Sequence, residues 1–174
     1  MVLARFAAIL SALLIASGAA SAQGAKPTDP QIAHIAYTAG LIDIAAADQA
    51  LQKSKNKDVV AFANDMKRDH QAVNDQALAL VKKLNVTPED NATSKTLNKQ
   101  ATDKRAELAK LSGAAFDKAY IDNEVAYHKA VDDALETALI PSASNQELKS
   151  LLQTGLKIFQ GHEQHAEHVA AEFK

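Results

Sequence analysis

The sequence predicts an all-α fold, a bundle of four long helices, from three observations. Apolar residues recur at spacings of three, four, seven and eleven, which places them on one face of an α-helix. The alternation of β-branched and polar residues that is typical of strands is absent from the sequence. The prolines occur only where a long segment would begin or end, and they are Pro27, Pro30, Pro88 and Pro141.

The first 22 residues are typical of a secretory signal peptide. Arg5 precedes an apolar run at 6–16, and the small residues at 20–22 form a cleavage pattern. The run is too short to span a bilayer, which needs about 20 apolar residues. We therefore expect cleavage after Ala22, export of residues 23–174 to the periplasm, and no integral membrane span afterwards. A retained membrane anchor is the alternative interpretation.

Residues 23–174 are enough for a single domain with one core. The chain has 19 Lys and Arg residues against 21 Asp and Glu residues. So balanced a charge offers no basic surface for nucleic acid. The sequence contains no cysteine, so stability must come from burial, or from a bound metal, without disulfides. The sequence leaves the oligomeric state open.

The first two long helices have recognisable start signals. The first is predicted over 30–54, with Asp29 as its N-cap and Pro30 as its first residue. The second is predicted over 56–85, where Asn56 and Asp58 favour a new start.

The turn "NVTPEDNAT" follows, and a polar, weakly amphipathic helix within 91–111 forms a crossover segment. The third long helix is predicted over 113–139. The fourth is predicted over 145–173, opened by a capping box of Ser144 and Glu147. Four long helices with a short one between the second and third resemble the ferritin-like four-helix bundle with a long crossover. A five-helix up-and-down array is the alternative.

Every long helix carries an ionisable residue on its apolar face. These residues are Asp43 on the first helix, His70 on the second, Glu124 and His128 on the third, and His162 on the fourth. All five lie within about one turn of the middle of their helices. A bundle of helices of similar length would therefore bring them to one place.

The residues of such a cluster must hydrogen-bond to one another, bind an ion or border water, because an unpartnered buried polar group costs about 1–3 kcal/mol. Imidazole and carboxylate together suit a divalent transition metal, either Zn, Fe, Cu, Ni or Mn. A buried network of histidines and carboxylates without metal is the alternative, and a substrate cleft is the third. No organic cofactor is expected.

The remaining histidines divide by their angle around the helix. His165 is about 60° from His162, at the edge of the apolar stripe, and is a further candidate ligand or supporting residue. His168 is about 120° away and is expected to meet solvent. His34 lies on the opposite side of its helix from Asp43, so we expect a surface or inter-helix role.

The direction of the acidic residues in "DMKRDH" can be predicted from their angle around the helix in the same way. Asp69 is about 100° from His70 and Asp65 about 140°, so their charges are predicted to point outward. Tyr120 and Tyr127 are expected to fill the core, and either hydroxyl could support Glu124.

The chain resembles the family catalogued as domain of unknown function 4142, which is regarded as ferritin-like and exported. The stretches that carry the resemblance are "GLIDIAAADQAL", "VVAFANDMKRDH", "KLNVTPEDNATS", "LSGAAFDKAYIDNEVAYHKAV", "LIPSASNQELKSLL" and "FQGHEQHAEH". The resemblance implies fold and export but no settled activity. It implies a set of recurrent polar positions, which are Asp43, His70, Glu124, His128, His162 and His165.

The di-iron site of ferritin-like oxidases does not match this sequence. That site takes a Glu from two helices and a Glu-x-x-His pair from each of the other two. Here Glu124 precedes His128 by four residues, and Lys67 stands three residues before His70. We therefore predict metal binding or storage, in a role such as stress tolerance. A structural or interaction protein is the first alternative, and a metal-dependent oxidoreductase of ferritin-like type is the second.

Overall fold

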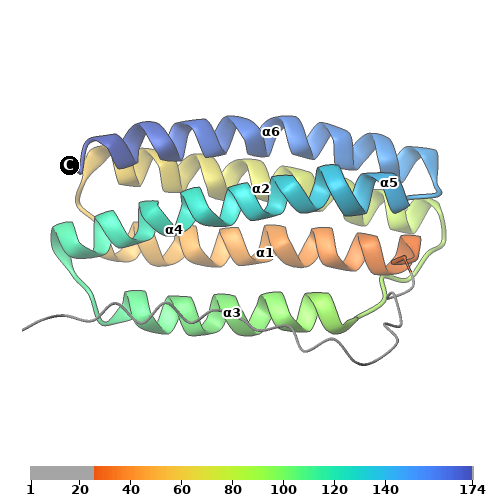
Figure 1. The fold of residues 1–174 in the computed structure, drawn as a ribbon, viewed down its shortest axis with the longest axis horizontal. Helices are drawn as coiled ribbons and strands as arrows, with labels where there is room; N and C mark the ends of the chain where they lie inside the picture. Colours follow the sequence, from red (N-terminus) through yellow and green to blue (C-terminus); the bar gives the residue numbers. More distant parts are fainter. Residues whose placement is uncertain (1–25, 174) are drawn as a thin grey trace, which may run out of the picture.

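A computed structural model describes residues 26–173, and over that part of the chain it is helical, without strands (Figure 1). The predicted signal peptide and its cleavage site lie outside the described residues. The helices are α1 (Asp29–Lys53), α2 (Lys57–Lys83), α3 (Ala92–Ala109), α4 (Gly113–Ala134), the π-helical turn η1 (Leu135–Leu139), α5 (Ile140–Ser142) and α6 (Gln146–Ala171).

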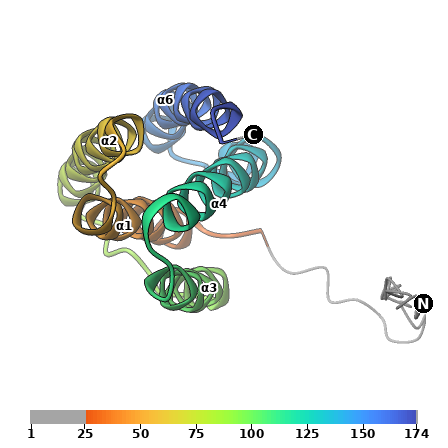
Figure 2. The same cartoon turned by 90° about the vertical axis from the view of Figure 1, so that its left-hand side faces the viewer.

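Helices α1, α2, α4 and α6 form a four-helix bundle, and α3 lies outside it beside α1 and α4 (Figure 2). Helix α1 packs against α2, and α4 packs against α6, each as an antiparallel pair (Figure 1). Helices α2 and α4 run in the same direction, so the chain must return along the bundle between them, and α3 makes that return. The predicted helical bundle is confirmed. Among the described helices α3 packs mainly on α1, whereas in the alternative five-helix array it would pack beside α2.

Two helix starts differ from their predictions by one residue. The N-cap of α1 is Thr28, and Asp29 is the first helical residue. The carboxylate of Asp29 accepts hydrogen bonds from the backbone N–H groups of Ser144 and Asn145, both at 2.8 Å. The N-cap of α6 is Asn145, whose side chain accepts from the N–H of Glu147 at 2.9 Å, so the predicted capping box at Ser144 is wrong. The contact between Asp29 and the start of α6 thus takes the place of the two caps predicted from local sequence.

The third long helix ends in an unusual way. Regular α-helix stops at Ala134, and a π-helical turn leads into α5, which contains Pro141. The N–H of Ile140 bonds to the carbonyl of Leu135, five residues back. Proline has no N–H to donate and its ring crowds the preceding turn, and the widened turn lies directly before it. The helix was predicted to end before this proline, but the helical path continues through it.

The core consists of two apolar clusters, one in each half of the bundle. The largest members of the first are Phe62, Met66, Phe116, Tyr120 and Ile121. The second contains Ile32, Ile35, Leu135, Leu139, Leu148, Leu152 and Phe159. The residues between them in helical register are the polar ones predicted to face inward. None of the described helices is long and apolar enough to cross a membrane.

Candidate metal centre

Five ionisable side chains from four helices lie buried between the two apolar clusters. Asp43 comes from α1, His70 from α2, Glu124 and His128 from α4, and His162 from α6. Each residue is at most 6% exposed. The structure therefore brings together the five residues that the helical pattern placed on the apolar faces.

The three histidines form a triad. The distance between ring centroids is 5.8 Å for His70 and His128, 5.2 Å for His70 and His162, and 5.6 Å for His128 and His162. One nitrogen from each ring lies within 4.8 Å of the other two. Three imidazoles at this separation can converge on one ion with modest side-chain adjustment.

A second group of ligand atoms adjoins the triad and shares one of its members. Carboxylate oxygens of Asp43 and Glu124 and a ring nitrogen of His128 also lie within 4.8 Å of one another. Asp43 Oδ2 is 3.4 Å from His70 Nε2, which links the two groups a second time. The acidic pair and the triad therefore form one continuous polar layer.

Hydrogen bonds decide which imidazole nitrogens remain free. His128 Nδ1 lies 2.9 Å from the backbone carbonyl oxygen of Glu124, which can only accept, so this nitrogen carries the proton. His162 Nε2 is 3.0 Å from a carboxylate oxygen of Asp69. The remaining nitrogens, His128 Nε2, His162 Nδ1 and both of His70, have no hydrogen-bond partner among the described residues. Metal-binding histidines commonly have this arrangement, with the second nitrogen held by a carbonyl or carboxylate.

Burial keeps the imidazoles neutral. Desolvation lowers the pKa of His128 to about 4, and it lowers the pKa of His70 well below its usual value. Desolvation also lowers the pKa of His162, while the hydrogen bond and charge of Asp69 act in the opposite direction. A neutral imidazole has the free lone pair that metal coordination requires.

The two carboxyl groups respond to burial in the opposite sense. Desolvation raises the pKa of Glu124 to about 7, although hydrogen bonds from Asp43 and Asn123 lower it. Desolvation, followed by the charge and hydrogen bonding of Glu124, raises the pKa of Asp43 well above its usual value. Without a cation the pair therefore retains a proton close to neutral pH, which a metal ion would displace.

Aromatic rings border the polar layer. Phe159 stacks on His70, with ring centroids 4.6 Å apart and an interplanar angle of 8°. The Tyr127 hydroxyl donates to the carbonyl oxygen of Ala39 at 3.2 Å, so its bond goes to the backbone and not to Glu124. Tyr120 is buried, and its hydroxyl has no partner within the part of the chain that is described.

The other predicted histidines lie outside both groups of ligand atoms. The side chain of His165 is 37% exposed, packs edge-on against Phe62, and has Nδ1 3.9 Å from Asp65. His168 meets solvent as predicted, with 79% of its side chain exposed. His34 is half-buried on α1, as expected for an inter-helix polar residue.

Asp69 belongs to the site, although its angle on α2 was predicted to direct it outward. Its side chain is only 27% exposed because it lies where α2 faces α6, and there it binds His162. Arg68 also donates a hydrogen bond to Asp69, and this bond is the main reason that the pKa of Asp69 is lowered. The helical angle locates Asp69 relative to His70 but cannot show which neighbouring helix covers that flank.

Comparison with known protein families shows a match over most of the chain. A model of the family described as "Domain of unknown function (DUF4142)" matches residues 15–169. Neither a curated protein nor a solved structure matches the chain.

Proposed function

The chain belongs to the family of domain of unknown function 4142, whose description names no activity. From the geometry of the site we propose that the protein binds a divalent transition metal. The proposed nitrogen ligands are His70, His128 and His162. One observation carries the proposal. Three buried imidazoles from three helices each have a ring nitrogen without a hydrogen-bond partner among the described residues, and their ligand atoms lie within 4.8 Å of one another.

The acidic pair supplies the charge that such a site requires. Asp43 and Glu124 adjoin the triad, and their raised pKa values reflect the cost of ionising them in the absence of a nearby cation. A divalent ion would stabilise both carboxylates and thereby lower these pKa values. The ligand set of imidazole and carboxylate suits Zn, Cu, Ni, Fe or Mn. Which of these metals binds is a question for measurement.

A metal-free network of histidines and carboxylates explains the cluster less well. A network that served only to fix helix packing would pair its buried donors and acceptors, since each unpartnered group costs about 1–3 kcal/mol. Here the atoms without partners in the described part of the chain include Asp43 Oδ1, Glu124 Oε2 and both nitrogens of His70. Their number and proximity favour an ion.

The proposed role is metal binding or storage rather than oxidation. Asp43 and Glu124 are the carboxylates of the described cluster, and a di-iron oxidase of this architecture uses four. We further propose that residues 23–174 act as one domain in the periplasm, in metal storage or stress tolerance. That setting rests on the N-terminal sequence pattern.

Metal titration of the purified full chain tests the proposal. The protein is dialysed against a chelator and then titrated separately with Zn, Cu, Ni, Mn and anaerobic ferrous ion, with elemental analysis after buffer exchange. At least one metal should bind stoichiometrically and raise the melting temperature. At a concentration 100 times the Kd, the gain in the free energy of unfolding is about 2.7 kcal/mol.

Two variants make the test specific to the triad. His70→Ala should abolish the metal-dependent rise in melting temperature. His168→Ala removes an exposed histidine from α6 and should leave the rise unchanged. If no metal is retained above background, or if His70→Leu is more stable than the wild type and metal has no effect on either, the cluster is a packing network and the proposal is wrong.

A further inference from the structure

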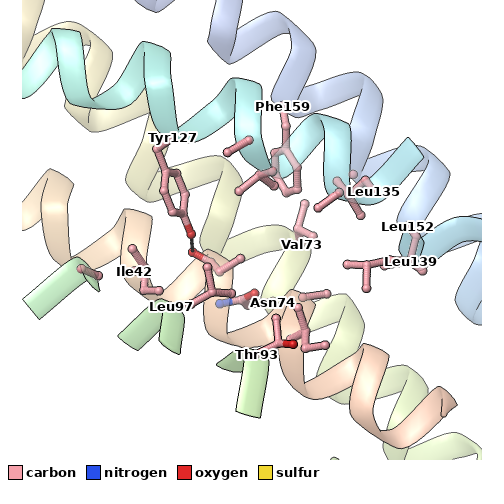
Figure 3. Close-up of a pocket in the computed structure, with 18 of the residues that line it drawn as sticks. Ile42, Val73, Asn74, Thr93, Leu97, Tyr127, Leu135, Leu139, Leu152 and Phe159 are labelled. Atoms are coloured by element: carbon pink, nitrogen blue, oxygen red, sulfur yellow. Dashed lines mark hydrogen bonds between the residues drawn. The ribbon is translucent and has the colours of Figure 1, made fainter. Parts of the chain in front are cut away.

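An apolar cavity of about 800 Å³ lies beside the candidate metal centre (Figure 3). It begins between α1, α3 and α4 and continues into the half of the bundle that contains the second apolar cluster. Phe159, which stacks on His70, forms part of its wall. Sites for small organic molecules in proteins measure about 300–1,000 Å³, so the cavity has the size of a binding site.

Small side chains leave this space open. On α4 the cavity is lined by four alanines at four-residue spacing, which are Ala126, Ala130, Ala134 and Ala138. On α1 it is lined by Ala36, Ala39 and Ala46. Helix α3 covers this seam, and its few large apolar side chains, such as Leu97, reach the cavity without filling it (Figure 3).

The walls suit a hydrocarbon chain better than a polar molecule. Most of the lining is aliphatic, and Figure 3 shows Ile42, Leu135, Leu139 and Leu152 along it. The hydroxyl of Tyr127, which also lines the cavity, is already bonded to the backbone of α1. A lining of this kind offers a hydrocarbon chain a large apolar area to bury.

Positive charge lies where the cavity reaches the surface of α3. Lys104 is exposed and Arg105 is half-buried, and both line the cavity. Lys104 pairs with Glu107 at 2.7 Å. The guanidinium of Arg105 has no carboxylate partner among residues 26–173, while its backbone carbonyl is held by Gln49 of α1 at 2.9 Å. The guanidinium is therefore available to pair with an anion at this end of the cavity.

We propose that the cavity binds a long-chain carboxylate, with the hydrocarbon chain inside and the carboxylate at Arg105. Apolar burial along the cavity supplies affinity, and the guanidinium can hold a carboxylate with two parallel hydrogen bonds. This site is separate from the metal centre and does not depend on it. Its occupant is identified by two features together, the aliphatic lining and the unpaired cation at one end.

Displacement of a fluorescent polyene fatty acid from the delipidated full chain tests the proposal. The chain has no Trp, so tryptophan absorption does not interfere with the probe. Saturated carboxylates of increasing length should displace the probe with a stoichiometry of one. Their affinity should rise about fourfold for each added methylene until the cavity is filled. Hexadecanol should bind about tenfold more weakly than hexadecanoate, because it lacks the charge.

Paired variants locate the binding site. Ala134→Phe places a large ring in the cavity and should weaken hexadecanoate binding at least tenfold. The control Ala61→Phe makes the same change at an exposed position of α2 outside the cavity, and it should have no effect on binding. Arg105→Gln should weaken hexadecanoate about tenfold and leave hexadecanol unchanged, with Lys99→Gln as the control on α3. Circular dichroism verifies that each variant is folded, and Arg105→Gln serves if Ala134→Phe does not fold.

Several results would overturn the proposal. One is failure of the full chain to bind the probe, and another is equal affinity of folded Ala134→Phe and wild type. Equal binding of acid and alcohol, together with no effect of Arg105→Gln, would remove the assigned role of the cation.

Discussion

The imidazoles of the candidate metal centre are oriented by groups that lie beside the ligand atoms. The carbonyl oxygen of Glu124 holds Nδ1 of His128, and the carboxylate of Asp69 holds Nε2 of His162. Each bond leaves the opposite nitrogen directed at the triad. A carboxylate that fixes a histidine in this way also raises the basicity of the ligand nitrogen.

Asp69 therefore provides a test at the scale of a single residue. Asp69→Ala should weaken metal binding by about 10–100-fold, the usual effect of removing a partner of a ligating histidine. Isothermal titration calorimetry measures the change. The control is Asp75→Ala, which removes an exposed carboxylate bonded to Gln71 on the same helix. Unchanged affinity in Asp69→Ala would show that His162 does not need this partner to bind metal.

Buried acids and buried imidazoles in this cluster have opposite effects on stability as pH changes. The pKa of Glu124 is about 7 in the fold against 4.5 normally, so between these values the folded state keeps a proton that the unfolded chain has lost. Stability from this group therefore falls as pH rises through that window. The pKa of His128 is about 4 against 6.5, so its contribution rises with pH between those values. At pH 6.5 an unfolded histidine is still about half protonated, so the histidine contribution continues to rise to about pH 7.5 and opposes the loss from Glu124.

The metal-free protein should consequently lose more stability between pH 6.5 and 8 than the variant Glu124→Gln. The difference is about 1 kcal/mol in the free energy of unfolding, because the variant lacks the carboxyl group that titrates. Urea unfolding at a series of pH values, in the presence of a chelator, measures it. Glu107→Gln, an exposed position on α3, is the control. An equal pH dependence of wild type and Glu124→Gln would mean that Glu124 is ionised in the metal-free fold at neutral pH.

At the scale of the helices, the α1 and α2 pair depends on a close approach at one glycine. A Cβ atom added to Gly40 would lie 2.4 Å from Oδ1 and 2.9 Å from Cγ of Asn74. Asn74 is itself buried, one turn along α2 from His70. The contact therefore helps set the spacing between two helices that carry cluster residues.

Two matched substitutions distinguish this contact from the general effect of glycine in a helix. Gly40→Ala should destabilise the protein by about 1–3 kcal/mol, because the added methyl group overpacks the interface. Gly161→Ala, where a Cβ would meet nothing within 4 Å, should stabilise by about 0.5–1 kcal/mol through helix propensity. Chemical denaturation gives both values. A stabilising Gly40→Ala would show that Asn74 moves aside at little cost.

At the scale of the whole molecule, α3 is the least firmly held of the long helices. Its buried residues are Ser94 and Leu108, whereas α1 buries eleven residues between Ile32 and Ala50, and α2 buries six between Val59 and Asn74. It lies outside the bundle (Figure 2), and its side chains line the apolar cavity. The four bundle helices can therefore remain packed while α3 opens locally.

Hydrogen exchange should reveal this difference. Amides in the middle of α3 should exchange faster than those in the middle of α1, α2, α4 and α6, and hexadecanoate should slow those of α3 selectively. Metal should instead slow the amides around His70, His128 and His162. Exchange followed by mass spectrometry of peptides resolves the helices. Equal protection of all five would mean that the molecule opens only as one unit.

Most of the fold could be predicted from local pattern. The stripe around His70 and the starts at Asn56 and Gly113 depend on neighbours within one or two turns, so the sequence contains the information that places them. The inward positions of Asp43 and Glu124 follow in the same way from helical periodicity. The shift of the caps from Asp29 to Thr28 and from Ser144 to Asn145 does not, because a bond between distant segments decides it.

The sequence by itself determined the helices, the crossover and the identity of the five residues that meet in the polar layer, since all three follow from the spacing of apolar and polar residues along a helix. The tertiary structure alone decided which nitrogens are free, that Asp69 reaches His162, that His165 stays outside both ligand groups, and that a cavity remains beside Phe159. These features depend on which helix covers each flank and how closely two backbones approach. Periodicity describes one helix at a time and contains neither quantity.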